Sequence, residues 1–331
     1  MKGLALGVIA LAAACGGGTD AGPAPDIIAV DGSSTVFPIT EAVAEAFQRT
    51  RPAIRLTVGE TGTGGGFQKF CRNETVISNA SRPIKASEAA ACTQAGIEFI
   101  ELPVAYDGLA VVVHPRNTWA TSMTVAELKT LWSPAAQGRV TRWNQVRASW
   151  PATEIHLFGP GTASGTFDYF TEAVNGKATE SRGDYTASED DNVLVQGVSG
   201  DAGGLGYFGL AYFEQNRDKL TLVAIDDENA ANGAGPIRPS AETVRNGTYR
   251  PLSRPLFIYV NAAALARAEV QEFLSFYLQS DRALIEEVGY VPLSDAEQTL
   301  VRARLAGKVT GTMFDVASQT SSLEALLRGP R

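Results

Sequence analysis

The chain has 331 residues, with 28 lysines and arginines against 36 aspartates and glutamates, so its formal net charge is −8. Hydrophobic residues make up 44% and charged residues 19% of the chain, which excludes a disordered protein and an integral membrane protein. The acidic balance argues against nucleic-acid binding, which needs a basic surface. We expect more than one core, because single cores stop growing near about 250 to 300 residues.

Few side chains are available to hold a metal ion. The only histidines are His114 and His156, and the cysteines are Cys15, Cys71 and Cys92, at spacings that match no recognised zinc or iron site. We therefore expect no metal and no other cofactor.

The N-terminus has the pattern of an export signal followed by a tether. The apolar stretch from Leu4 to Ala14 is about half as long as a membrane-spanning helix, and it ends in small residues before Cys15. These residues resemble the lipobox of bacterial lipoproteins, in which the cysteine is acylated, although Ala12 stands where that motif usually has leucine. An ordinary secretory signal is the alternative. We expect a signal peptide over 1–14, then a lipidated cysteine and a flexible tether over 15–26.

After the tether, short apolar strands alternate with amphipathic helices. Apolar residues alternate or run together in the expected strands and recur every three or four residues in the expected helices. In the first third of the chain this pattern predicts strands at 27–30, 54–58, 76–77, 97–102 and 109–113, and helices at 37–47, from 67–70 onward and at 87–94. This order is typical of a mostly parallel sheet covered by helices.

The rest of the chain continues the alternation without a repeat of fixed period. It predicts helices at 125–132, 166–174, 270–278 and 282–288, strands at 155–158, 220–225 and 256–260, and a Gly-rich segment at 203–207. Two α/β lobes joined by two strand-like crossings, near 104–108 and 254–259, account for this order. We therefore expect residues 27–106 and 256–331 to form lobe I and residues 107–255 to form lobe II, with a ligand in the cleft between them.

Three loops rich in Gly, Ser and Thr, at residues 31–35, 60–66 and 159–166, each follow a strand and open a helix. The first N–H groups of a helix lack partners and carry partial positive charge, while Ser and Thr add hydroxyl donors. Each loop alone has a structural explanation, because these residues are common helix caps and turn formers. Three such loops on two lobes favour a site that holds a small tetrahedral oxyanion from both sides. The second loop is not a nucleotide P-loop, because no Lys followed by Ser or Thr comes after its last glycine.

Two charged residues could complete an oxyanion site. Arg82 follows a strand end, and its planar guanidinium suits phosphate; the alternative is an exposed surface arginine. Asp107, at the first crossing, could accept a hydrogen bond from a protonated phosphate oxygen, whereas fully ionised sulfate has no proton to donate; the alternative is a turn aspartate.

The second and third cysteines form an even pair if Cys15 carries lipid. In an oxidising compartment we expect Cys71 and Cys92 to form a disulfide, with two buried free thiols as the alternative. Closing a loop of about 22 residues would contribute about 3 kcal/mol to stability. No histidine lies close in sequence, so we expect a structural and not a catalytic pair.

Seven segments resemble, in content and order, the PstS family of phosphate-binding lipoproteins of bacterial phosphate ABC transporters. They are GSSTVFPIT, GETGTGGGFQKFC, ISNASRPIK, VAYDGLAVVV, GPGTASGTFDYFTEA, SEDDNVLVQGVSGD and RPLFIYVN, and the resemblance extends over residues 27 to about 293. The resemblance implies a type II periplasmic-binding-protein fold, with two α/β lobes joined by a two-strand hinge. It also implies a monomeric, extracytoplasmic, lipid-anchored protein, in the periplasm or on the cell surface. Such a protein binds inorganic phosphate with high affinity, delivers it to the membrane permease of an ABC transporter and is not an enzyme.

The resemblance also places the phosphate-binding residues. The donors fall on Ser34, Thr35, the backbone of Val36 and Phe37, Thr63, Ser164, Gly165 and Thr166. The chain departs from the family at two positions, because Pro160 stands where the best-known members carry an arginine and Ser81 where they carry an aspartate. We expect Arg82 and Asp107 to supply the charge and the acceptor instead, with Ser81 beside them.

Three other functions remain open. The chain could bind another oxyanion, such as sulfate or molybdate. A secreted serine hydrolase would use Ser164 as its nucleophile, but the surrounding residues lack the Gly-x-Ser-x-Gly elbow, and only His114 or His156 could act as the base. A surface adaptor for another protein would bind no oxyanion.

Overall fold

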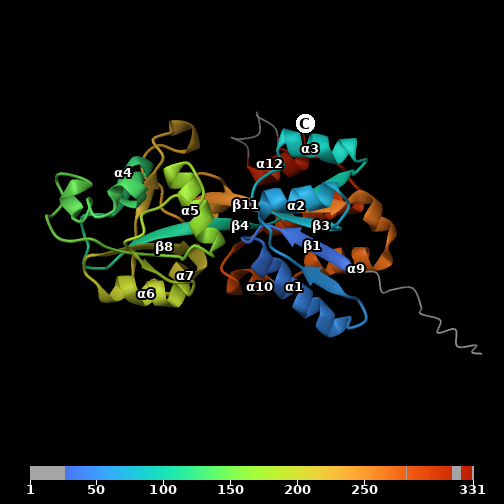
Figure 1. The fold of residues 1–331 in the computed structure, drawn as a ribbon, viewed down its shortest axis with the longest axis horizontal. Coiled ribbons are helices and arrows are strands. Elements are labelled where there is room, and N and C mark those ends of the chain that lie inside the picture. The colour runs from blue at the N-terminus through green and yellow to red at the C-terminus, as the bar shows by residue number, and fades with distance from the viewer. Residues whose placement is uncertain (1–26, 281, 315–321, 330–331) are drawn as a thin grey trace, which may run out of the picture.

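The computed structural model describes residues 27–280, 282–314 and 322–329, so the expected signal peptide, the lipidation site Cys15 and the tether lie outside the described residues. Figure 1 shows two lobes side by side, joined by long strands that run from one into the other. No helix within the described ranges is long and apolar enough to cross a membrane.

One sheet runs through both lobes. Its strands are β1 (Ile28–Gly32), β2 (Leu56–Val58), β3 (Ile77–Ala80), β4 (Phe99–Val113), β6 (His156–Gly159), β7 (Thr186–Ala187), β8 (Gly204–Gly209), β9 (Thr221–Leu222), β11 (Ser253–Asn261) and β12 (Val291–Pro292). Their order is β2-β1-β3-β11-β4-β8-β6-β7, and β9 and β12 also pair with β4. A separate pair joins β5 (Ser122–Thr124) to β10 (Ala224–Asp226).

The sheet is mixed and not mostly parallel as the sequence predicts. Strands β1, β2 and β3 are parallel to one another, and so are β6, β7 and β8. The long strands β4 and β11 are antiparallel to each other and to their outer neighbours β8 and β3. The parallel pattern was predictable because helices link those strands, whereas the direction of the two long strands depends on pairing between distant segments.

Both expected crossings are strands of this sheet. All 15 residues of β4 are buried, and β4 pairs with β11 up to Gly108 and with β8 from Leu109 onward. The two strands predicted at 97–102 and 109–113 are therefore one continuous strand, because the residues between them also pair with β11. The predicted lobe boundaries, 27–106 with 256–331 and 107–255, stay a prediction.

Helices cover the sheet in each lobe (Figure 1). In lobe I they are α1 (Phe37–Thr50), α2 (Gly62–Cys71), α3 (Ala86–Gln94), α9 (Ala268–Tyr277), α10 (Arg282–Glu287), α11 (Asp295–Ala306) and α12 (Leu323–Arg328). In lobe II they are α4 (Val125–Trp132), α5 (Gly165–Asn175), α6 (Asp191–Gly200), α7 (Leu210–Gln215) and α8 (Ala241–Arg245). Helix α1 illustrates the pattern, because Ile39, Val43 and Phe47 lie one turn apart and are all buried.

Helix α2 begins at Gly62, five residues before the start predicted from the apolar pattern. Its first turns contain three consecutive glycines, although glycine disfavours helix by about 1 kcal/mol relative to alanine. A Cβ atom on Gly66 would lie 2.5 Å from the Cα of Gly32 and 2.9 Å from Oγ of Ser78. Glycine is therefore required for α2 to pack directly on β1 and β3.

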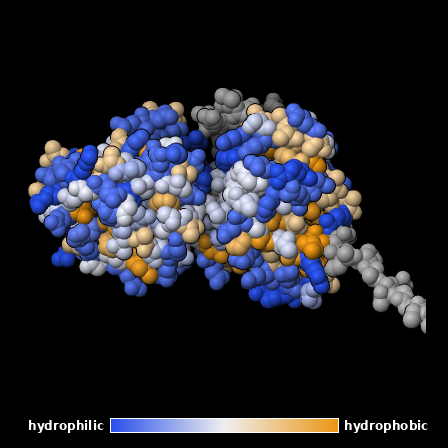
Figure 2. Space-filling model, viewed as in Figure 1, coloured by the Kyte–Doolittle hydropathy of each residue, from blue (hydrophilic) through white to orange (hydrophobic). Residues whose placement is uncertain are grey.

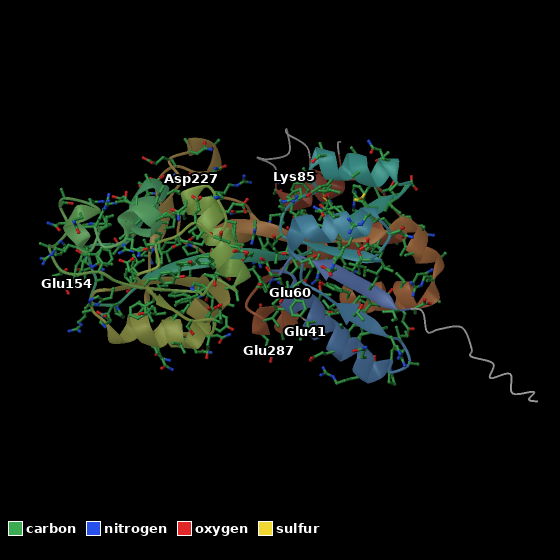
Figure 3. All side chains as sticks on the ribbon, in the orientation of Figure 1. Glu41, Glu60, Lys85, Glu154, Asp227 and Glu287 are labelled. Carbon is green, nitrogen blue, oxygen red and sulfur yellow. A yellow bond between two sulfur atoms is a disulfide. The ribbon has the colours of Figure 1, made fainter. Side chains whose placement is uncertain are left out.

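The predicted disulfide is confirmed, since Cys71 at the end of α2 is bonded to Cys92 in α3. Figure 3 shows this bond in yellow beneath α3. Both cysteines are buried in a small apolar cluster with Phe67 and Phe99. The bond therefore fastens the carboxyl end of α2 to α3.

Candidate functional site

The first loop lies at the carboxyl end of β1, beside the carboxyl end of β3. Gly32 pairs with Asn79, and the N–H of Ser33 donates to the Asn79 carbonyl at 2.9 Å. The backbone N–H groups of Val36 and Phe37 both donate to the Ser33 carbonyl, at 3.2 and 3.0 Å. The predicted residues Ser34 to Phe37 thus form a tight turn into α1, next to the loop that follows β3.

Asp31 fastens the first loop to the second. One carboxylate oxygen, Oδ1, accepts hydrogen bonds from the backbone N–H and the hydroxyl of Thr61, at 3.1 and 2.6 Å. The other, Oδ2, pairs with Nζ of Lys69 at 2.6 Å. Burial raises the pKa of Asp31, but the hydrogen bonds from Lys69 and Thr61 outweigh it and hold the pKa below its ordinary value. The ionised carboxylate therefore fixes the start of α2 beside the first loop.

Thr63 and Ser81, two of the predicted phosphate-binding residues, are in contact. Oγ1 of Thr63 accepts from the backbone N–H of Ser81 at 3.1 Å and lies 3.1 Å from the Ser81 hydroxyl. Thr63 lies in the first turn of α2, and Ser81 follows β3 directly. Both are therefore at the edge of lobe I where the first loop also lies.

Arg82 is already paired within lobe I. Its guanidinium donates two hydrogen bonds to the Glu88 carboxylate, at 2.9 and 2.8 Å, and one to the Pro83 carbonyl. Burial raises the pKa of Glu88, but the hydrogen bond from Arg82 contributes to a net lowering, so Glu88 stays ionised. The charge of Arg82 is balanced by Glu88, which weakens the expectation that Arg82 neutralises a bound anion.

The third loop, at the start of α5, meets the first loop across the lobes. Ser164 caps α5, with its hydroxyl oxygen accepting from the N–H of Thr166 at 3.2 Å. Gly165 lies so close to Thr35 that a Cβ atom on it would be 2.5 Å from Oγ1 and 2.9 Å from both the backbone N and the Cα of Thr35. The predicted residues of lobe II therefore face those of β1 and α1 directly.

Arg254, which was not among the residues predicted from the sequence, also lies at this contact. It lies on β11 opposite Asp107 of β4. Nη2 of Arg254 donates to Oδ2 of Asp107 and to Oγ1 of Thr35, both at 3.2 Å, and Nε donates to the same Asp107 oxygen at 3.3 Å. The centre of the guanidinium lies 3.6 Å from the centre of the Tyr169 ring of α5. One side chain thus joins both crossing strands, the first loop and α5.

Burial shapes the protonation of the acidic groups around Arg254. The side chains of Arg254 and Asp107 are 15% and 3% exposed. Burial raises the pKa of Asp107, and the attraction of Arg254 opposes the rise only in part. Burial also raises the pKa of Asp168, whose Oδ1 is buried and has no hydrogen-bond partner among the described residues. The carboxyl oxygens of Asp107 and Asp168 are therefore hydrogen-bond acceptors around the largely buried guanidinium of Arg254.

A sequence signal for Arg254 did exist. It is the first residue of the RPLFIYVN segment and stands at the start of the second crossing. Placing it against Asp107 needs the antiparallel register of β4 and β11, which no local pattern specifies. Within the described ranges, no group of three or more His, Cys, Asp or Glu side chains is arranged to hold a metal ion.

Comparisons with known proteins identify the family. The PBP superfamily domain matches residues 19–282. Protein SphX of Synechococcus elongatus is 49% identical over 304 residues, which are 91% of this chain and 88% of SphX. The phosphate-binding protein PstS of Staphylococcus saprophyticus is 37% identical over 91% of this chain and 92% of its own. The chain belongs to the family of SphX and PstS. The resemblance expected from the seven segments is thereby confirmed.

Solved structures agree with this membership in the SphX and PstS family. A structure described as a "possible phosphate binding protein from Planctomyces limnophilus" is 50% identical, with a TM-score of 0.81 over 86% of this chain and 99% of that one. An ABC-type phosphate transport receptor from Vibrio cholerae is 22% identical, with a TM-score of 0.61 over 80% of this chain and all of that one, and it supports the fold alone. The expected α/β fold of periplasmic binding proteins is confirmed.

Proposed function

We propose that this chain is the extracytoplasmic binding protein of a phosphate ABC transporter. It binds inorganic phosphate with high affinity between its lobes, delivers the ion to a membrane permease, and is not an enzyme. The observation that carries the proposal is the contact of Thr35 with Gly165 and Arg254, which brings helix starts from both lobes and a buried cation to one place. Membership of the SphX and PstS family supports phosphate as the ion.

The ligands that we assign come from four parts of the chain. They are Ser34, Thr35 and the backbone of Val36 and Phe37 in the first loop, Thr63 and Ser81, then Ser164, Gly165 and Thr166, and finally Asp107 with Arg254. The N–H groups of Val36 and Phe37, which donate to the Ser33 carbonyl in this structure, turn to the ion when it binds. For the counter-charge we prefer Arg254 to Arg82, because Glu88 already balances Arg82. Asp107 accepts the proton of monohydrogen phosphate and repels sulfate, which has none.

Short-range hydrogen bonds are sufficient for tight binding. A hydrogen bond to a charged group contributes about 1.5 to 3 kcal/mol net, so several of them exceed the cost of closing the lobes. A micromolar complex needs about 8 kcal/mol. The overall charge of −8 has little effect on this step, because salt screens charges beyond about 8 Å.

Lobe closure and anchoring complete the proposal. The two lobes, residues 27–106 with 256–331 and residues 107–255, move relative to each other about a hinge. The hinge lies where β4 and β11 pass from one lobe to the other. The permease recognises the closed form, which phosphate binding stabilises. Removal of residues 1–14 leaves Cys15 acylated, and residues 15–26 hold a monomeric protein close to the outer face of the membrane.

Calorimetry on protein stripped of ligand by unfolding and refolding tests the function. Phosphate should bind at one site, more tightly than sulfate or molybdate at every pH tested. A preference for sulfate would overturn the choice of ion, and no heat with any of the three would overturn the function. Replacing His156 with Gln should leave binding unchanged. Mass spectrometry of the membrane fraction should find lipid on the native protein and none after Cys15→Ala.

A further inference from the structure

Helix α5 turns one face toward lobe I. On this face, a Cβ atom added to Gly165 would lie 2.5 Å from Oγ1 of Thr35. One turn later, the centre of the Tyr169 ring lies 3.6 Å from the centre of the Arg254 guanidinium. Residues three and four apart share a face of a helix, so Asp168 lies on this face between the two contacts. Helical side chains lean toward the start of their helix, which brings the Asp168 carboxyl toward the place where the lobes meet.

Asp168 has a carboxyl oxygen that no described residue satisfies. Its Oδ1 is shielded from solvent and accepts no hydrogen bond within the described ranges. Burial raises the pKa of Asp168, Arg254 opposes the rise, and Glu172 on the next turn of α5 adds to it. A buried acceptor without a donor costs about 1 to 3 kcal/mol, so folded proteins rarely keep one. Asp168 therefore offers an acceptor that a ligand with a donor would satisfy.

Asp107 offers a second acceptor beside the same arginine. Its Oδ2 takes both hydrogen bonds from Arg254, at 3.2 and 3.3 Å, and no described residue donates to its Oδ1. In the part of the chain that the structure describes, Arg254 is also the one cation that contributes to the pKa of either Asp107 or Asp168. Two carboxyls therefore share one positive charge.

The other titratable side chains that act on these carboxyls are neutral. Three buried phenols interact electrostatically with one carboxyl or the other, and they are Tyr169, Tyr207 and Tyr290. Burial raises the pKa of each phenol, so all three keep their protons at neutral pH. The protonation of the site is therefore decided by the two carboxyls and the ion between the lobes.

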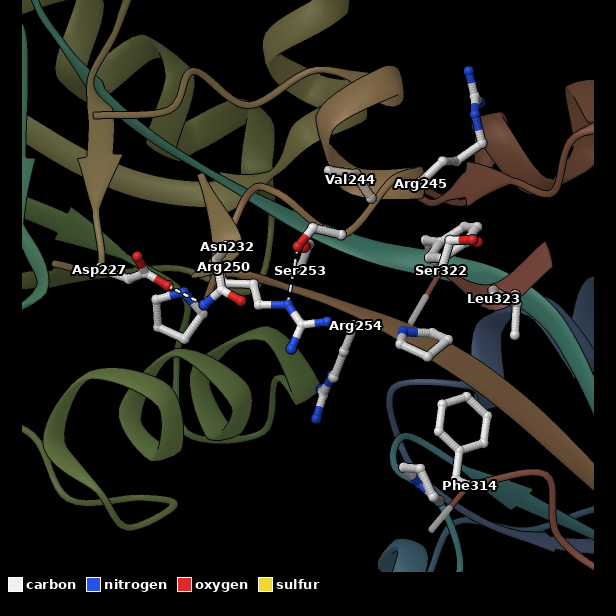
Figure 4. Close-up of a pocket in the computed structure, with 15 residues that line it drawn as sticks. Asp227, Asn232, Val244, Arg245, Arg250, Ser253, Arg254, Phe314, Ser322 and Leu323 are labelled. Atoms are coloured by element: carbon white, nitrogen blue, oxygen red, sulfur yellow. Dashed lines mark hydrogen bonds between the residues drawn. The ribbon is translucent and has the colours of Figure 1, made fainter. Parts of the chain in front are cut away.

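A pocket of about 390 Å³ between the lobes opens this region to solvent (Figure 4). Arg254 lines it, and Figure 4 shows this side chain reaching from β11 into the pocket. Figure 2 shows the surface hollowed between the two lobes. The other charged residues of the described lining, Asp227, Arg245 and Arg250, contribute to the pKa of neither carboxyl. A proton can therefore reach the site from solvent without a change in the charge balance around Arg254.

The number of acceptors decides how many protons the bound ion needs. An unprotonated phosphate oxygen is itself an acceptor, and it is repelled by a carboxylate that it faces. Monohydrogen phosphate has one proton, which satisfies Asp107 and leaves Asp168 against an unprotonated oxygen. Dihydrogen phosphate has two protons, one for each carboxylate. It also brings one negative charge instead of two to a site where two carboxylates already outnumber one guanidinium.

We propose that Asp168 is a second proton acceptor of the phosphate site, so that the closed site holds phosphate with two protons, one shared with Asp107 and one with Asp168. This inference rests on the proposed function. When the ion in solution is monohydrogen phosphate, the second proton comes from solvent as the ion binds. It then lies in the hydrogen bond between Asp168 and a phosphate oxygen. Sulfate has no proton to share at neutral pH and meets two carboxylates, so Asp168 adds to the selectivity against sulfate.

Proton uptake on binding tests this inference. Calorimetric titrations with phosphate, in buffers that differ in ionisation enthalpy, give the number of protons taken up with each ion. In the alkaline range where free phosphate is the dianion, the wild-type protein should take up one proton per ion. Its Kd should then rise about tenfold per pH unit, which is the effect of one proton.

The variant Asp168→Asn should take up no proton, because its amide donates to the unprotonated oxygen instead. Its Kd for phosphate should change less than twofold over the same alkaline range. It should also bind sulfate about tenfold more tightly than the wild-type protein does, because one of the two repelling carboxylates is gone. A residue with a purely structural role would not produce this gain.

The matched control is Glu172→Gln, which removes the same charge from the same face of α5, one turn farther along the helix. It should take up one proton, like the wild-type protein. Equal uptake by Asp168→Asn and this control would overturn the role of Asp168. Binding without uptake by the wild-type protein would overturn the second proton and leave the proposed function intact, even if the variants failed to fold. No binding of phosphate by the wild-type protein would overturn the proposed function itself.

Discussion

Replacing Gly165 with alanine should weaken phosphate binding while leaving the fold as stable as before. The added Cβ atom would lie 2.5 Å from Oγ1 of Thr35 and 2.9 Å from its backbone N. Real Cβ atoms do not approach backbone this closely, so the lobes must separate at this point. Separation breaks the enclosure that the proposed site depends on, while each lobe keeps its own packing.

The magnitude follows from the cost of overpacking. An extra methyl group in a well-packed contact costs about 1 to 3 kcal/mol, and in the proposed mechanism this cost falls on the closed form alone. The Kd for phosphate should therefore rise by about five- to 150-fold. Stability of α5 should not fall, because alanine favours helix by up to about 1 kcal/mol over glycine and the backbone at this position suits any residue.

Calorimetric titration with phosphate and urea denaturation measure these two effects separately. Gly200→Ala is the matched control, because a Cβ atom there meets nothing within 4 Å. If Gly165→Ala binds phosphate as tightly as the Gly200→Ala control, the contact between Thr35 and Gly165 does not exist in the loaded protein, and the proposed two-sided grip is wrong.

Three further predictions concern stability and charge. Replacing both Cys71 and Cys92 with serine should lower the free energy of unfolding in urea by about 3 kcal/mol and leave the calorimetric Kd unchanged, because the bond lies away from the loops. Burial raises the pKa of Asp191 to about 7, so the folded protein holds a proton that the unfolded chain releases above about pH 4. The unfolding free energy should therefore fall, by at most about 4 kcal/mol, as the pH rises from about 4 to 7, and Asp191→Asn should remove this fall in urea titrations. Arg254→Met should abolish phosphate binding and cost about 3 to 5 kcal/mol of stability, because it leaves Asp107 unpaired. Adding Asp107→Asn should restore the stability but not the binding. A double variant as unstable as the single one would contradict the pairing.

The parts of this site that sequence alone predicts are those with a local cause. Ser164 was identifiable because a helix start favours a polar cap, and Ser164 is the cap of α5. Asp107 was identifiable as a charge inside an apolar strand. The disulfide followed from counting cysteines.

The parts that sequence could not supply depend on distant segments. Arg254 meets Asp107 only through the register of two strands more than 140 residues apart in sequence. Three glycines at the start of α2 are typical of a loop, and the need for glycine at the last of them, Gly66, is visible only in its close packing against Gly32. The pairing of Arg82 with Glu88 could not be predicted from the sequence, because it depends on where α3, which carries Glu88, lies relative to Arg82.

The strand order has a consequence for how the chain reaches its final form. Strand β11 lies between β3 and β4, yet it is made about 140 residues after β4. Until β11 has been synthesised up to residue 261, strand β3 has no neighbour on one side, and nothing joins the β1, β2 and β3 part of the sheet to β4. The N-terminal lobe cannot be completed before β11 has been synthesised, so a truncated chain ending before β11 should expose two open edges and aggregate instead of forming a smaller native protein.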